Sequence, residues 1–279
     1  MMEKHLIALD LDGTLLNDDK IISARTIQTL KTAKEQGHVV MIATGRPYRV
    51  SKQFYQQLGL DTPIVNMNGA YVHHPLNKNW DHMHSPLPKN VALDIVDTST
   101  QYGVQNIMAE IMDQVFINQE SEHIFNQFFL EGLEKPAKIG HLRETLDGDP
   151  SSLLVHPNED SVKPIRQILD DQHASVIDHR KWGAPFHVIE IIRSGLHKAI
   201  GVKKVAEEYG IPQNRIIAFG DEDNDLEMID YAGVGVAMNN GIYELKNIAK
   251  EITLTNHEDG VAQFIEEYLN ITTPIITQD

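Results

Sequence analysis

Two aspartates near the start of the chain are the first residues whose type and spacing could do chemistry. Asp10 and Asp12 follow the apolar run 5–9 and precede Gly13. Residues two apart in an extended segment lie on the same face, so these carboxylates can point toward one ligand. Neighbouring carboxylates repel each other unless a cation lies between them. The stretch therefore predicts a divalent cation site. The alternative is a strand that ends in an Asx turn.

Two other stretches could bind an anion. Thr44 and Gly45 follow the apolar run 39–43 and offer a hydroxyl and a backbone amide, although a simple strand-to-helix turn would use the same residues. Lys198 begins an expected helix over 197–209, at the end where the helix dipole disfavours a cation. An ammonium group and helix amides that point the same way would hold a phosphoryl oxygen. The alternative for Lys198 is a solvated surface lysine, and position alone does not decide between the two.

A further stretch, residues 221–225, contains four carboxylates and comes one residue after an expected strand over 215–219. Glu222 and Asp223 can be explained as helix caps, because acids at a helix N-terminus bind its unpaired amides and suit its dipole. Asp221 comes first after the strand and is better placed to face the aspartates near the start of the chain. Oxygen ligands without histidine or cysteine favour Mg²⁺.

The order of strands and helices predicts how these stretches are positioned. We expect an α/β fold: a Rossmann-like parallel sheet core with helices on both faces, plus an inserted α+β cap domain. In a parallel sheet the carboxyl ends of the strands share one edge, where ligands bind. The predicted core comprises residues 1–86 and 190–270, the cap residues 87–189, and a tail residues 271–279. The cap elements are expected as helices at 88–102, 121–131 and 160–172 and as strands near 104–109, 114–118, 152–156, 174–179 and 186–192.

Composition narrows the classes of partner. The 279 residues are 41% hydrophobic, enough for a substantial core, and 24 basic against 40 acidic residues give a net charge of −16. This charge argues against nucleic acid and anionic membranes as partners. The absence of cysteine excludes disulfides, thiolate metal sites and a cysteine nucleophile. With no signal-peptide pattern and no apolar run near about 18 residues, we expect a cytoplasmic protein. As a separate expectation, the protein is a monomer or weak homo-oligomer.

Four histidines flank the polar turn 77–79 of an expected hairpin: His73, His74, His82 and His84. A histidine metal site is one interpretation of this group. Exposed hairpin histidines are the favoured one, because the chain contains 14 histidines in all.

Taken together, the motifs resemble those of the haloacid dehalogenase superfamily of phosphohydrolases, in its Cof-like subfamily with a large α/β cap. They follow the family's order along the whole chain, and the unmatched middle falls where the family inserts its cap. The matching stretches are Leu9–Leu15, Ala43–Pro47, Asn68–Ala70, Lys198, Phe219–Asp225 and Asn256–Val261. One departure is the Leu-His pair at 196–197, where the family more often has a small pair. It bears on the geometry of Lys198.

The resemblance implies a mechanism through an aspartyl-phosphate. Asp10 would be the nucleophile, and Asp12 the general acid and then the base for water. Mg²⁺ would be held by the carboxylates of Asp10 and Asp221 and the backbone carbonyl of Asp12, with Asp225 supporting the water shell of the metal. The residues expected to contact the phosphoryl group or substrate are Leu11, Thr44, Gly45, Arg46, Lys198 and Asn224.

The residue types suit phosphoryl transfer independently of the resemblance. This reaction needs an in-line nucleophile and neutralisation of charge, which an aspartate and a magnesium ion supply. We therefore predict a magnesium-dependent phosphatase of small phosphorylated metabolites such as sugar phosphates. The rivals are a sugar phosphomutase of the same superfamily and a non-catalytic phosphate- and metal-binding regulatory module. Asp12 argues against the second rival, because binding alone needs no acid or base.

Overall fold

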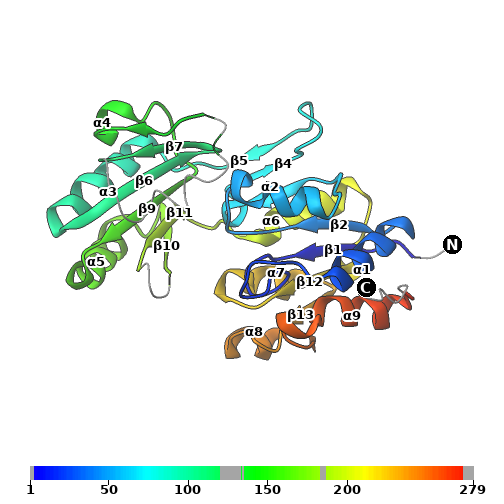
Figure 1. Cartoon of the computed structure of the whole chain (residues 1–279). Helices are drawn as coiled ribbons and strands as arrows, with labels where there is room; N and C mark the ends of the chain where they lie inside the picture. Colours follow the sequence, from blue (N-terminus) through cyan, green and yellow to red (C-terminus); the bar gives the residue numbers. More distant parts are fainter. Residues whose placement is uncertain (1–2, 120–132, 134, 183–186, 273–279) are drawn as a thin grey trace. The chain divides into compact units, whose positions relative to one another are not determined.

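The structure is a computed structural model that describes residues 3–119, 133, 135–182 and 187–272 (Figure 1). The chain divides into two compact units: unit 1 comprises residues 1–46, 51–82 and 197–279, and unit 2 comprises residues 47–50 and 83–196. The helix predicted over 121–131 lies outside the described residues. In the described part of the chain, no helix combines the length and apolar character needed to cross a membrane.

Unit 1 contains a five-stranded sheet in the order β14-β13-β12-β1-β2, in which every neighbouring pair is parallel. Its strands are β1 (Leu6–Leu9), β2 (Val39–Ile42), β12 (Ile216–Gly220), β13 (Val234–Ala237) and β14 (Glu251–Ile252). The strands β3 (Ile64–Asn66) and β4 (Tyr71–His73) form an antiparallel pair, which a bridge between Ala43 and Val65 joins to the end of β2. The helices are α1 (Ala24–Glu35), α2 (Tyr48–Gln57) from Ser51 on, α6 (Lys198–Glu208), α7 (Leu226–Tyr231), α8 (Tyr243–Ile248) and α9 (Gly260–Leu269).

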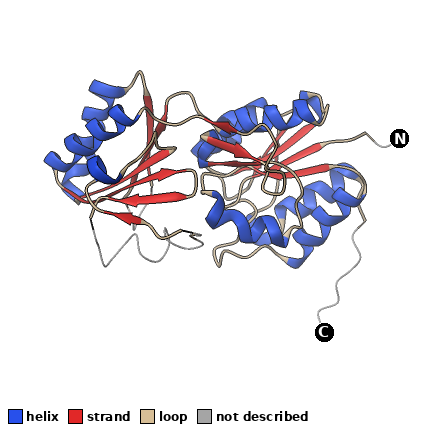
Figure 2. Ribbon diagram, turned by 90° about the horizontal axis from the view of Figure 1, so that it is seen from above, coloured by secondary structure: helices blue, strands red, loops and turns tan. Residues whose placement is uncertain are grey.

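Helices lie on both sides of the strands in unit 1 (Figure 2). Every residue of β1 and β2 is buried, as expected for parallel strands covered on both faces. Helix α1 begins after Ser23, whose side chain accepts a hydrogen bond from the Thr26 N–H. These features confirm the predicted parallel α/β core.

The strand order places the carboxyl ends of β1, β2 and β12 next to each other. Leu9, the last residue of β1, is in register with Ile42 of β2 on one side and Phe219 of β12 on the other. The chain moves from β1 to β2 in one direction and later returns to β12 in the other. Ligands of open α/β sheets bind at such a reversal of strand order.

Unit 2 contains a six-stranded sheet in the order β10-β11-β9-β6-β7-β8, antiparallel except for the β7–β8 pair. Its strands are β6 (Val104–Ile111), β7 (Gln114–Ile117), β8 (Lys138–Ile139), β9 (Ser152–Pro157), β10 (Ile177–Lys181) and β11 (Ile189–Arg193). The unit also holds β5 (Met83–His84), α3 (Lys89–Tyr102), α4 (Leu142–Thr145) and α5 (Val162–His173). Its described helices lie on one side of the strands (Figure 2). The predicted α+β insertion is confirmed.

The limits of the two units differ from the predicted domain boundaries by a few residues. Strand β11 pairs with both β9 and β10, so residues 190–193 belong to the second sheet and not to the predicted core. At the other end, Ile271 is buried and its N–H donates to the Glu266 carbonyl at 2.9 Å, so the predicted tail begins too early. The assignment of the second unit as a cap for substrate specificity stays a prediction.

Candidate active site

The polar stretches predicted from the sequence begin where β1, β2 and β12 end. The backbone N–H of Asp10 donates to the Phe219 carbonyl at 3.2 Å, and the N–H of Ala43 donates to the Leu9 carbonyl at 2.9 Å. These bonds continue the sheet ladder beyond the strands. They bring Asp10 level with the polar turns that follow the two neighbouring strands.

Lys198, the first residue of α6, is buried at this edge of the sheet. Its Nζ lies 2.6 Å from Asp10 Oδ1 and 2.7 Å from Asp225 Oδ1. Its side chain is 0% exposed, so the alternative of a solvated surface lysine is wrong. A buried ammonium is very unfavourable without partners, and two carboxylates compensate this charge. The Leu-His departure at 196–197 leaves Lys198 in contact with both carboxylates.

Asp225 fixes the loop that follows β12. Its Oδ2 accepts the backbone N–H groups of Asp221 at 3.0 Å and Glu222 at 3.2 Å, while its other oxygen contacts the lysine. Glu222 is the N-cap of the short helix Asp223–Asp225 and forms a capping box with Asp225, in agreement with the capping interpretation. A Cβ on Gly220 would lie 2.5 Å from the Asp225 side chain, so glycine permits this close approach.

Asp221 completes a group of three carboxylates. Its Oδ1 accepts the Thr14 hydroxyl at 2.8 Å, and a Cβ on Gly13 would lie 2.1 Å from its Oδ2. Gly13 has a φ of +76°, so this position requires glycine for both backbone and space. Carboxylate oxygens of Asp10, Asp221 and Asp225 all lie within 4.8 Å of one another. Within the described residues, this is the group with the composition and spacing to hold a metal ion.

The close carboxylates perturb one another. Burial raises the pKa of Asp10 well above its ordinary value; Lys198 opposes this shift, while the charges of Asp225 and Asp221 add to it. Burial and the charge of Asp225 likewise raise the pKa of Asp221 to about 7. Burial lowers the pKa of Lys198, but the carboxylates of Asp10 and Asp225 outweigh it and the net direction is upward. A divalent cation between the carboxylates would favour their ionised forms.

The Asp12 side chain contacts two cationic side chains and is not part of the group formed by Asp10, Asp221 and Asp225. It accepts hydrogen bonds from the Nε and Nη2 atoms of Arg46, both at 2.6 Å, and from Lys20 Nζ at 2.8 Å. Burial raises the pKa of Asp12, but the hydrogen bonds and charges of Arg46 and Lys20 outweigh it and lower the pKa to about 2. The Arg46 guanidinium also lies 5.5 Å from the centre of the Phe54 ring.

The remaining predicted residues lie around the loop that follows β2. The Thr44 hydroxyl is buried and accepts the backbone N–H two positions further on at 3.1 Å. Gly45 lies beside two amides: a Cβ there would lie 3.2 Å from the Asn68 side chain and 3.5 Å from Asn224 Nδ2. Leu11 is 0% exposed as a whole residue, and its contact with the substrate stays a prediction.

Three residues of this region were not among the predicted site residues. Thr14 belongs to the matching stretch Leu9–Leu15, and its place beside Asp12 and Gly13 could have indicated a role in the site. Asn68 belongs to a matching stretch for which the sequence suggested no role. Lys20 follows Asp12 by eight residues in a polar loop, where no regular helix or strand sets which side chains face each other.

The four hairpin histidines are not part of the potential metal-ligand group among the described residues. Of the four, His82 is exposed and the others are partly buried, so the expectation of exposed histidines is wrong in part. His73 Nε2 lies 3.2 Å from Asn66 Oδ1, and its ring stacks on Tyr71 with the centroids 4.4 Å apart. Burial, with the charges of His82 and His74, lowers the pKa of His73 to about 4.

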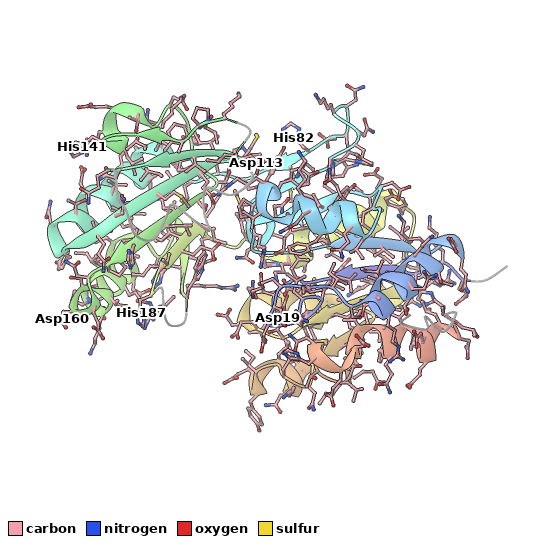
Figure 3. All side chains as sticks on the ribbon, viewed as in Figure 1. Asp19, His82, Asp113, His141, Asp160 and His187 are labelled. Carbon is pink, nitrogen blue, oxygen red and sulfur yellow. The ribbon has the colours of Figure 1, made fainter. Side chains whose placement is uncertain are left out.

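This shift predicts a loss of stability at acidic pH. Folding lowers the pKa of His73 from 6.5 to about 4. The contribution of this residue to folding stability is therefore complete above pH 6.5 and is lost as the pH falls toward 4. Between pH 7 and pH 4.5, the free energy of unfolding should fall by about 2–3 kcal/mol because of His73. Urea unfolding at pH 7 and pH 4.5 should show a smaller loss for His73→Gln than for the wild type. His141→Gln, at the exposed start of α4 in unit 2 (Figure 3), is the control. Equal losses in all three proteins would contradict the prediction.

Comparisons with known proteins agree with the geometry. A family model described as haloacid dehalogenase-like hydrolase matches residues 7–265. The chain is 53% identical over 267 residues to the 5-amino-6-(5-phospho-D-ribitylamino)uracil phosphatase YitU of Bacillus subtilis, with 96% of this chain and 98% of the relative covered. It is 28% identical to the pyridoxal phosphate phosphatase YbhA of Escherichia coli, covering 96% and 100%. A solved haloacid dehalogenase-like hydrolase from Bacteroides thetaiotaomicron superposes with a TM-score of 0.82 at 28% identity, covering 95% and 100%.

Proposed function

The chain belongs to the haloacid dehalogenase-like hydrolase family, and we propose that it is a magnesium-dependent phosphatase of small phosphorylated metabolites that works through an aspartyl-phosphate. The observation that carries this proposal is the buried contact of Lys198 with Asp10 and Asp225 beside Asp221. It joins a potential nucleophile, a phosphate-binding cation and carboxylates for a metal at one sheet edge. Phosphoryl transfer needs these parts and little else.

The donor set fits Mg²⁺. The three carboxylates supply hard oxygen ligands. Burial and mutual repulsion disfavour the ionised forms of Asp10 and Asp221, and a cation between the carboxylates would offset this. Asp10 and Asp221 would hold the ion together with the Asp12 carbonyl. Both oxygens of Asp225 already accept hydrogen bonds within the protein, which favours a supporting role for it. When bound, the ion would neutralise the phosphoryl oxygens and lower the repulsion toward an anionic nucleophile.

Local charge supports an anionic substrate despite the acidic chain. Three cations lie among the carboxylates of the site: Lys20 and Arg46 contact Asp12, and Lys198 contacts Asp10 and Asp225. A divalent cation would add two positive charges to this group. These cations would attract a phosphate monoester at short range, where the rest of the protein would repel it.

We assign two steps to this site. In the first, an Asp10 oxygen forms a bond to phosphorus, the bond to the leaving oxygen breaks, and Asp12 donates a proton to that oxygen. In the second, Asp12 takes a proton from water as the water oxygen attacks phosphorus, which releases phosphate and restores Asp10. Lys198 would hold the phosphoryl oxygens during both steps. Thr44, Gly45 and Asn224 would bind them from the neighbouring loops.

Asp12 must carry a proton to act as the acid, although the hydrogen bonds and charges of Arg46 and Lys20 lower its pKa to about 2. A phosphoryl group carries negative oxygens that compete for the same two cations. We expect substrate binding to weaken the hydrogen bonds of Arg46 and Lys20 to Asp12 and to raise the pKa of Asp12. The contact of Arg46 with Asp12 is thus compatible with its predicted contact with the substrate.

The names of the relatives indicate which substrates to test first. The relative with 53% identity is named for 5-amino-6-(5-phospho-D-ribitylamino)uracil, and another for pyridoxal phosphate. We propose that this chain acts on a phosphorylated metabolite of that size, and that the predicted cap, residues 87–189, determines which substrate is bound. The experiment is a panel of these two compounds, sugar phosphates and p-nitrophenyl phosphate, with phosphate release measured with and without Mg²⁺. Transfer of phosphate to a second position of a sugar without release of free phosphate would contradict the proposal and favour a phosphomutase.

Calcium should inhibit the enzyme. Ca²⁺ binds the same carboxylate oxygens as Mg²⁺, but its larger and looser coordination shell should misplace Asp10 relative to phosphorus. Steady-state rates with p-nitrophenyl phosphate should fall as CaCl₂ is added at fixed MgCl₂ and recover when MgCl₂ is raised. NaCl at matched ionic strength is the control. Full activity with calcium as the sole divalent cation would count against the proposed metal site.

A further inference from the structure

The turn between β3 and β4 has an unusual backbone. Met67, Asn68 and Gly69 have φ values of +50°, +52° and +97°, so three successive residues are left-handed. Glycine adopts this conformation freely and asparagine tolerates it, whereas methionine does not. A left-handed methionine is strained, and such strain persists only where the surrounding contacts impose it.

The contacts that impose it come from the proposed phosphoryl site. The N–H of Asn68 donates to the Thr44 carbonyl at 3.2 Å, and the N–H of Met67 donates to the Arg46 carbonyl at 3.3 Å. On another side, a Cβ on Gly69 would lie 2.5 Å from the carbonyl oxygen of His197, the residue before Lys198. The turn is therefore packed between the loop after β2 and the start of α6.

The Asn68 side chain connects this turn to a third part of the site. It is 2% exposed, and its Oδ1 accepts a hydrogen bond from Asn224 Nδ2 at 3.0 Å. Both amides lie beside Gly45, at 3.2 Å and 3.5 Å from the position that a Cβ of Gly45 would take. The loops after β2, β3 and β12 meet at this point.

The direction of this hydrogen bond has a chemical consequence. Phosphoryl oxygens only accept hydrogen bonds, so an amide that binds them must present its NH₂ group and not its carbonyl. Because Asn68 Oδ1 can only accept a hydrogen bond, its partner on Asn224 must be the NH₂ group. The Asn224 amide is therefore held with its NH₂ group toward Asn68 and Gly45. An NH₂ group carries two hydrogens, so Asn224 can donate one to Asn68 and the other to a ligand.

We propose that Asn68 is a positioning residue for phosphoryl transfer, which fixes the Asn224 amide with its NH₂ group toward the phosphoryl oxygens and holds the loop that carries Thr44 and Gly45. This inference rests on the proposed function and adds a residue to it. Asn68 acts through Asn224, and its own side chain is not required to contact the substrate.

Asn68→Gly tests the inference, because glycine keeps the left-handed backbone and removes the acceptor. We expect kcat/KM for p-nitrophenyl phosphate to fall about tenfold, the order of one hydrogen bond. Asn270→Gly is the matched control: Asn270 has a φ of +53° at the end of α9 and lies outside the site. It should retain wild-type turnover. Wild-type kcat/KM in Asn68→Gly would overturn the inference.

A double-mutant cycle separates positioning from a general structural effect. If Asn68 acts through Asn224, the variant that combines Asn68→Gly with Asn224→Ala should be little worse than Asn224→Ala alone. Losses that multiply would show that the two residues act independently, which overturns the inference.

A measurement of inorganic phosphate binding tests the inference separately from the proposed function. Calorimetric titration of the wild type and of Asn68→Gly with inorganic phosphate in MgCl₂ needs no turnover. If the wild type binds phosphate but hydrolyses no ester, the proposed function fails, and a weaker affinity of Asn68→Gly still supports positioning. Equal affinities of the two proteins, or absence of phosphate binding by the wild type, overturn positioning, whereas the proposed function is decided by ester turnover.

Discussion

Asp10→Asn should abolish turnover while the protein stays folded. Asp10 would supply the oxygen that bonds to phosphorus, and an amide oxygen is a far weaker nucleophile than a carboxylate. Loss of a covalent nucleophile typically costs on the order of 10⁴-fold or more in kcat. Phosphate release from p-nitrophenyl phosphate in MgCl₂ should fall to background. Substantial activity would refute the nucleophile assignment.

The variant should still fold, because asparagine has nearly the same shape as Asp10 and Asp225 remains beside the buried Lys198 ammonium. Two effects on stability oppose each other. Asparagine removes a carboxylate whose pKa burial raises, but it also removes one of the two partners of Lys198. The control is Asp19→Asn, the same change in the exposed loop before α1 of unit 1 (Figure 3), which should leave turnover unchanged. Urea unfolding of the three proteins in EDTA measures the stability effect.

Asp12→Asn should show a loss that depends on the leaving group. The alkoxide of a sugar phosphate is a poor leaving group and needs a proton as the bond breaks, whereas p-nitrophenolate leaves without one. General acid catalysis is typically worth 10²–10⁴-fold. The variant should lose on that order more in kcat/KM against sugar phosphates than against p-nitrophenyl phosphate.

The comparison must use kcat/KM, because this quantity covers only the steps up to formation of the aspartyl-phosphate. Asp12 should also activate water in the second step, and that role affects kcat for both substrates. The aryl ester thus serves as the internal control for loss of the hydrogen bonds to Arg46 and Lys20, which both substrates share. Equal losses in kcat/KM for the two substrates would mean that Asp12 is not the acid.

The sequence by itself determined the parallel core and the place of the candidate site. The run Leu6–Leu9 is apolar throughout and is followed by Asp10, which favours a buried strand that places an acid at a sheet edge. The turn at Thr44 and the loop at Asp221 follow strands of the same kind. Local pattern suffices for these features, because burial on both faces and the abrupt change to polar residues are properties of consecutive residues.

The tertiary structure alone decided which side chains pair. Lys198 and Asp10 are 188 residues apart, and whether that lysine is solvated or buried depended on where α6 packs. The contacts of Lys20 with Asp12 and of Asn224 with Asn68 likewise join residues that do not lie in one helix or strand. The limits of the units were set by the partners of β11, which lie elsewhere in the chain. Pairing energies of this kind depend on distance in space and on burial, which local sequence patterns do not encode.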